Sequence, residues 1–124
     1  APRTVAVVED DSSMRRSVER LLNAHGYRTE AYPSAEAFLD RGTPGEIGCL
    51  VLDIHLGAMT GIQLRYRLSE GGSAVPVIFI TAVDDKSLER QALQAGCVAC
   101  LHKPFAGNLL IAAVEVALAG SPRL

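Results

Sequence analysis

Four short apolar segments constrain what this chain can fold into more than any other feature. They cover residues 5–8, 49–52, 77–80 and 98–101, and each has the length of a β-strand. Three of them (5–8, 77–80 and 98–101) are rich in aliphatic residues and lack polar alternation, which is typical of strands covered on both faces of a parallel sheet. A fifth, more polar segment at residues 27–32 fits an edge strand.

Segments with helical spacing lie between and after these strands. Apolar residues recur three or four positions apart at residues 14–22, 35–39, 62–68, 88–93 and 109–117. Helix caps are predicted at Asp11 or Ser12, at Ser34, at Asp84 or Asp85, and at the closing Gly26 and Gly96. Strands that alternate with helices require right-handed crossovers. The sequence therefore predicts an α/β fold, a doubly wound five-stranded parallel sheet with helices on both faces.

Length, charge and cysteine count exclude several classes of protein. The 124 residues suit one domain, and 12 basic against 14 acidic side chains provide no basic surface for a nucleic acid. The longest apolar stretch, residues 109–120, contains Glu115 and is too short to cross a membrane. Three cysteines argue against a disulfide framework. We therefore expect a cytoplasmic domain that binds neither membrane nor, by itself, nucleic acid.

Polar residues that follow the strands carry the chemistry. Ligands of a doubly wound sheet bind beyond the carboxyl ends of its strands, so residues just after each apolar segment are informative. These residues are Glu9, Asp10 and Asp11 after the first strand, then Asp53, then Thr81, then Lys103 and Pro104. We expect them to meet at one edge of the sheet, although Asp11 fits a helix cap better than a ligand.

The acidic residues of this group predict a Mg²⁺ site. Carboxylates at one edge repel one another unless a cation lies between them, and oxygen ligands with open positions suit Mg²⁺. Thr81 offers a hydroxyl donor and Lys103 a charge suited to phosphate oxygens. Asp53 stands alone after a central strand and is the candidate nucleophile, because a carboxylate can attack phosphorus to give an acyl phosphate.

The combination of motifs resembles the receiver domain of two-component response regulators. The motifs are Glu9-Asp10, Asp53, Thr81-Ala82 and Lys103-Pro104-Phe105. Residues 21–27 (Leu-Leu-x-x-x-Gly-Tyr) followed by Ser34-Ala35-Glu36 are similar to receivers of nitrogen-fixation-type transcriptional regulators. The resemblance implies a flavodoxin-like fold with strand order 2-1-3-4-5. It covers essentially all of residues 1–124, and the Gly120-Ser121-Pro122 stretch fits a receiver trimmed from a longer regulator ahead of a linker.

The function implied by this resemblance is a phospho-accepting signalling switch, not an enzyme that acts on a separate substrate. Asp53 would accept a phosphoryl group from a histidine kinase or a small phosphodonor, and the domain would catalyse its own phosphorylation and dephosphorylation. Mg²⁺ would be held by Asp10, Asp53 and the backbone carbonyl of His55, with Glu9 acting through water. Thr81 and Lys103 would contact the phosphoryl oxygens, and the Lys103–Pro104 bond would be cis.

The implied partners are a histidine kinase, a C-terminal output domain or partner protein, and a second copy of the chain bound on phosphorylation. Phosphorylation would pull Thr81 inward and reshape the face formed by the fourth helix, fifth strand and fifth helix. This chain departs from the family pattern in three places. Glu9 replaces the commoner Asp, residues 54–57 lack the usual proline, and Cys100 occupies the position of an aromatic switch residue.

Other interpretations stay open at this stage. An aspartyl-phosphate hydrolase is the main alternative function, although such enzymes place an Asp-x-Asp pair after the first strand. Cys97-x-x-Cys100 near His102 suggests zinc or redox chemistry, against which we favour small buried apolar residues. In the last helix, Ile111, Val116 and Leu118 fall outside the main apolar stripe, which fits either an ordinary variable face or a docking surface.

Overall fold

The computed structural model describes residues 4–41, 47–82 and 86–120. A five-stranded parallel sheet has the order β2-β1-β3-β4-β5, which confirms the predicted fold class. The strands are β1 (Thr4–Val8), β2 (Arg28–Tyr32), β3 (Ile47–Asp53), β4 (Val77–Thr81) and β5 (Ala99–His102). The helices are α1 (Ser12–Ala24), α2 (Ala35–Leu39), α3 (Gly61–Glu70), α4 (Lys86–Ala95) and α5 (Gly107–Ala119).

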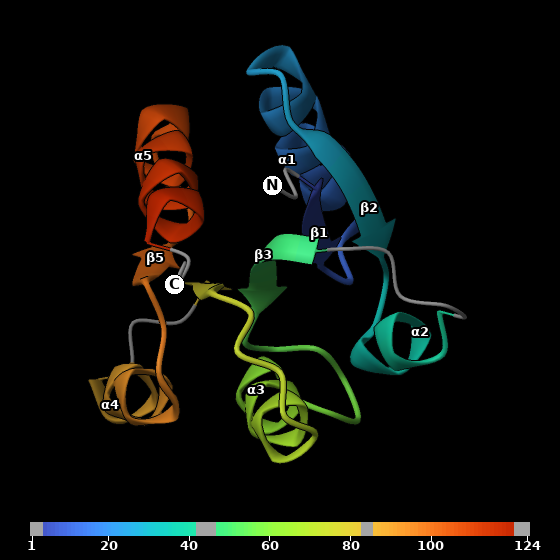
Figure 1. Cartoon of the computed structure of the whole chain (residues 1–124), viewed down its shortest axis with the longest axis vertical. Coiled ribbons are helices and arrows are strands. Elements are labelled where there is room, and N and C mark those ends of the chain that lie inside the picture. The colour runs from blue at the N-terminus through green and yellow to red at the C-terminus, as the bar shows by residue number, and fades with distance from the viewer. Residues whose placement is uncertain (1–3, 42–46, 83–85, 121–124) are drawn as a thin grey trace.

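The helices form two layers around the sheet. Helices α1 and α5 lie on one side, and α2, α3 and α4 lie on the other (Figure 1). Alternate strand residues point to the two layers: Val5 and Val7 pack toward α1 and α5, whereas Ala6 and Val8 pack toward α2 and α3. Each face of the central strands is therefore buried, which explains why their sequences lack polar alternation.

The two edge strands differ from the prediction in one respect. β2 lies at one edge, as its polar sequence indicated. β5 lies at the other edge: Ala99 and Leu101 pack against the core on the side of α1 and α5 and Cys100 against the core on the opposite side, so both faces have contacts, but these residues are only half-buried. The cause is topological, because β5 has a neighbouring strand on one side only. An apolar composition alone does not distinguish such an edge strand from a central one.

Local capping explains where the helices begin and end. Asp11 caps α1 by accepting hydrogen bonds from the backbone of Ser13 and Met14, and Ser34 caps α2 through Ala37. Gly26 follows α1 with a φ of 87°, a conformation that favours glycine. The cap predicted at Asp84 or Asp85 lies outside the described residues. Among the described residues, no helix is both long and apolar enough to cross a membrane.

Helix α5 is buried more completely than its sequence indicated. Ile111 was expected outside the apolar stripe, but it lies in the core with Leu110 and Val114. Leu118 is half-buried against the same cluster, whereas Val116 and Leu109 remain 60% and 51% exposed. The expected apolar surface on α5 is therefore smaller than predicted and consists of Leu109 and Val116.

Two neighbouring leucines of α5 provide a test of this packing. Leu110 is fully buried and Leu109 is half exposed, so truncating Leu110 leaves a cavity and truncating Leu109 does not. We expect Leu110→Ala to lower the free energy of unfolding by about 2–5 kcal/mol. Leu109→Ala should change it by no more than about 0.5 kcal/mol. Urea unfolding measures both, and equal losses would contradict the assigned burial.

Candidate functional site

Glu9 directly follows β1 and is the most deeply buried residue of the candidate site. Its side chain is completely buried, and its Oε2 atom accepts a hydrogen bond of 3.0 Å from the backbone N–H of Asp11. The backbone of Glu9 is held on both sides. Its N–H donates to the Tyr32 carbonyl, and its own carbonyl accepts from Arg15 Nη1 at 2.8 Å. Sequence patterns did not point to Arg15, which stabilises this turn from α1.

Lys103 joins the acidic residues of two different strands. Its ammonium lies 2.8 Å from Glu9 Oε1 and 3.4 Å from Asp53 Oδ2. The backbone N–H of Lys103 donates to the Thr81 carbonyl, which aligns the end of β5 with the end of β4. The following peptide bond to Pro104 is cis, as predicted. The backbone of Lys103 is thus positioned by the sheet, independently of the contacts that its side chain makes.

Asp53 is the last residue of β3, the strand next to β1, and Thr81 is the last residue of β4, the strand next to β5. Asp53 is 3% exposed and Thr81 is 1% exposed. One carboxylate oxygen of Asp53 accepts a hydrogen bond of 3.1 Å from the backbone N–H of His55. The other faces Lys103. Asp53 therefore has one oxygen fixed by the backbone of its own loop and one oxygen beside a cation.

Burial and pairing shift the ionisation of this cluster. Desolvation raises the pKa of Glu9 to about 7, because the ion pair with Lys103 only partly offsets the loss of water and the nearby Asp53 charge adds to the shift. Burial alone would lower the pKa of Lys103, but the contacts with Glu9 and Asp53 outweigh it and raise that pKa. Lys103 is therefore a stable cation, whereas the Glu9 charge is incompletely compensated.

The acidic residues have the donor set and spacing of a divalent-cation site. Oxygen atoms of Glu9, Asp10 and Asp53 lie within 4.8 Å of one another, and no other such cluster of His, Cys, Asp or Glu occurs among the described residues. The buried Glu9 Oε1 atom is paired with the Lys103 ammonium at 2.8 Å and has no further hydrogen-bond partner among the described residues. An all-oxygen cluster with a buried carboxylate oxygen that has coordination to spare fits Mg²⁺.

Asp10 and Asp11 are adjacent but have different surroundings. Asp10 is exposed and belongs to the acidic cluster, whereas Asp11 uses its carboxylate to cap α1. The cap assignment of Asp11 is thereby confirmed. His55 is exposed beside Asp53 and contributes its backbone N–H to the site.

The cysteines of the Cys97-x-x-Cys100 pair do not form a metal cluster with the described residues. Both are half-buried and pack against the apolar core between the sheet and helices α2, α3 and α4. Burial, with smaller contributions from Cys97 and Glu89, raises the pKa of Cys100 to about 11, so its thiol stays protonated. Both therefore behave as small apolar residues, though less buried than expected. His102 instead contacts Glu89 and links β5 to α4.

Gly61 is a positioning residue that the sequence did not reveal. It is the first residue of α3, where a Cβ atom would overlap the carbonyl oxygen of Asp53 and lie 3.2 Å from the Cα atom of Ile54. The Gly61 N–H donates to the Ile54 carbonyl at 2.9 Å. A capping box between Thr60 and Gln63 fixes the start of this helix. The Thr60-x-x-Gln63 pattern is the sequence signal from which the helix start at Gly61 could have been predicted.

The chain matches the family model of the response regulator receiver domain over residues 5–115. It is 39% identical to the transcriptional regulatory protein TdiR of Thauera aromatica over 94% of this chain and 51% of that protein. It is 36% identical to the transcriptional regulatory protein FixJ of Azorhizobium caulinodans over 94% of this chain and 56% of that one. The solved structure of FixJ-N superposes with a TM-score of 0.90 at 31% identity, covering 100% of this chain and 99% of that chain.

The sheet order, with an acidic cluster at the carboxyl ends of its strands, places the chain among doubly wound α/β domains of the receiver type. The chain belongs to the response regulator receiver family, as its sequence motifs indicated. It spans about half the length of the curated relatives it matches.

A single methyl group tests the contact between α3 and the end of β3. We expect Gly61→Ala to lower the free energy of unfolding by about 1–3 kcal/mol, because the Asp53 backbone must move. Gly71→Ala is the matched control. Gly71 ends the same helix with a φ of −81°, and its Cβ would meet atoms no closer than 3.5 Å. Urea unfolding of both variants is the measurement, and equal stability would contradict the predicted clash.

Proposed function

We propose that this receiver domain is switched by phosphorylation of Asp53. The arrangement that carries the proposal is the convergence of Asp53, an adjacent cation and an acidic cluster with the spacing of a metal site at the carboxyl edge of the sheet. Asp53 is nearly buried, and its Oδ1 atom is held by the His55 N–H while Oδ2 faces Lys103. A carboxylate held in this way has one orientation toward an incoming phosphoryl group.

The transfer forms one bond and breaks one bond. A carboxylate oxygen of Asp53 bonds to phosphorus while the bond between phosphorus and the donor atom breaks, the electron pair leaving with the donor. The donor is a phosphohistidine nitrogen of a histidine kinase or the oxygen of a small acyl phosphate. Lys103 offsets the charge on the phosphoryl oxygens, and the Thr81 hydroxyl donates to one of them.

Mg²⁺ is the cofactor of this proposal. Asp10, Asp53 and the backbone carbonyl of His55 would hold the ion, with Glu9 acting through water. When bound, the ion neutralises charge on the phosphoryl oxygens. The raised pKa of Glu9 and the lack of any described hydrogen-bond partner for Oε1 beyond its ion pair with Lys103 support this assignment, because both reflect a charge that Lys103 alone compensates incompletely.

The α4-β5-α5 face is the output surface of the proposal. Thr81 ends β4, and its carbonyl accepts a hydrogen bond from the Lys103 N–H. A displacement of Thr81 would therefore shift the end of β5. The contact of His102 with Glu89 continues this connection to α4. Cys100 stands at the aromatic switch position, and its thiol has no ring to reorient, so the switch rests on Thr81. The exposed Leu109 and Val116 of α5 provide apolar contacts for an output domain, a partner protein or a second phosphorylated copy.

The acceptor is tested by intact mass. Incubation with Mg²⁺ and acetyl phosphate should add about 80 Da, the mass of one phosphoryl group, and Asp53→Asn should abolish the adduct. Asp40→Asn, an exposed aspartate at the end of α2, is the matched control and should retain it. Labelling that persists in Asp53→Asn would place the acceptor elsewhere.

Two neighbouring aspartates test the metal site. We expect Asp10→Asn to weaken Mg²⁺ binding by about tenfold or more, since a direct ligand should matter at least as much as an outer-shell partner. Asp11→Asn removes the same charge one residue away and keeps a good helix cap, so it should bind nearly as the wild type does. Amide shifts during a Mg²⁺ titration give both affinities. Equal weakening would show that general negative charge, not ligation by Asp10, attracts the ion.

A further inference from the structure

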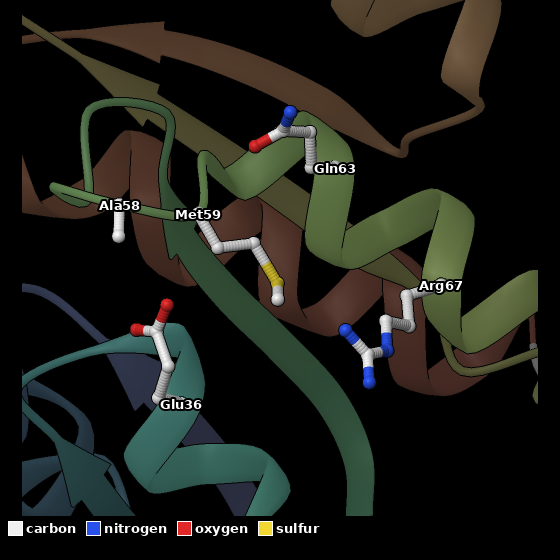
Figure 2. Close-up of a pocket in the computed structure, with 5 residues that line it drawn as sticks. All are labelled: Glu36, Ala58, Met59, Gln63 and Arg67. Carbon is white, nitrogen blue, oxygen red and sulfur yellow. The ribbon is translucent and has the colours of Figure 1, made fainter.

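A groove of about 330 Å³ lies between α2 and α3, on the sheet face opposite α1 and α5. It is lined by Glu36, Ala58, Met59, Gln63 and Arg67. Figure 2 shows Glu36 and Arg67 reaching toward the groove from α2 and α3, with the Met59 side chain between them. The groove therefore has an acidic wall, a basic wall and an apolar centre.

The two charged side chains that face this groove have no partner among the residues that the structure describes. Both are exposed, and within residues 4–41, 47–82 and 86–120 neither side chain makes a hydrogen bond or ion pair. Neighbouring arginines are paired: Arg41 binds Glu30, and Arg65 donates to the Gly96 carbonyl and to Ser69. The unpaired state of Glu36 and Arg67 is thus not a general property of this surface.

We propose that the groove is a self-association surface that binds a second copy of this chain about a twofold axis through Met59. A rotation by 180° about an axis between the two walls places Glu36 of each copy over Arg67 of the other. Two equivalent ion pairs then form, because a twofold interface is self-complementary. Charge complementarity favours this occupant, since one acid and one base on opposite sides of the axis match their own rotated image.

Met59 supplies the apolar centre of the contact. Its side chain is half-buried against the core below and reaches into the groove above. An unbranched thioether adapts its shape, so the two Met59 side chains that flank the axis supply the apolar contact between the copies. The interface is small and its ion pairs are exposed, so the association is weak and depends on salt.

This contact would act on the phosphorylation loop. Ala58 and Met59 belong to the segment between Asp53 and α3, and Gly57 in that segment has a φ of 70°, which proline cannot adopt. The loop that holds Asp53 through His55 is therefore the loop that the second copy would touch. The surface is separate from Leu109 and Val116 of α5, so the inference does not depend on the proposed output face.

Charge reversal at the two walls gives a direct test. We expect unphosphorylated wild-type protein at low ionic strength to form dimers at concentrations near 1 mM, the range of weak association. Glu36→Arg and Arg67→Glu should each weaken association by about tenfold or more, because each creates two like-charge contacts. An equimolar mixture of these two variants should associate again, since every contact across the axis then pairs opposite charges. The double variant Glu36→Arg/Arg67→Glu should associate with itself. Sedimentation equilibrium measures all four samples.

Matched reversals on the other layer control for net charge. Arg20→Glu and Glu115→Arg carry the same changes of charge at exposed positions of α1 and α5, and each should associate as the wild type does. Amide spectra show whether each variant is folded. Should a reversed variant unfold, Glu36→Gln and Arg67→Gln replace it and should weaken association severalfold. A monomeric wild type near 1 mM, or a mixture of the two groove variants that associates no better than either alone, would overturn the proposal.

Discussion

The ion pairs of Lys103 with Glu9 and Asp53 are the interaction on which the site depends. A carboxylate as buried as Glu9 is costly without a cation, and Asp53 beside it adds like-charge repulsion. Lys103 reaches both acids because β1, β3 and β5 run parallel and end at the same edge. The compensation is partial, as the raised pKa of Glu9 shows, and partial compensation suits the proposed role of the site, in which it would accept both a metal ion and a phosphoryl group.

The junction between β3 and α3 connects this charge cluster to the rest of the fold. Gly61 lets the start of α3 approach the carbonyl of Asp53, and the Thr60 cap fixes where that helix begins. The intervening loop is consequently short and tied at both ends, by His55 to the Asp53 carboxylate and by Gly61 to Ile54. The same loop lines the groove between α2 and α3, so contacts at that surface and chemistry at Asp53 share one structural element.

Much of the fold was predictable because it depends on local patterns. The aliphatic segments at residues 5–8 and 77–80 form β1 and β4, buried on both faces, and the Asp11 cap follows from local hydrogen-bonding chemistry. The prediction missed the partial exposure of residues 98–101 and the burial of Ile111, for one reason. Whether an apolar residue is covered depends on which elements lie beside it, and periodicity within one segment carries no information about its neighbours.

The sequence by itself determined the alternation of strands and helices, the residues that follow each strand and the family to which the chain belongs. It determined them because strand length, apolar pattern and capping act over a few residues. Only the tertiary structure decided that Lys103 lies between Glu9 and Asp53, that Gly61 must lack a side chain, and that Glu36 and Arg67 face one groove. These features join residues distant in the chain, and their geometry depends on how the helices pack against the sheet.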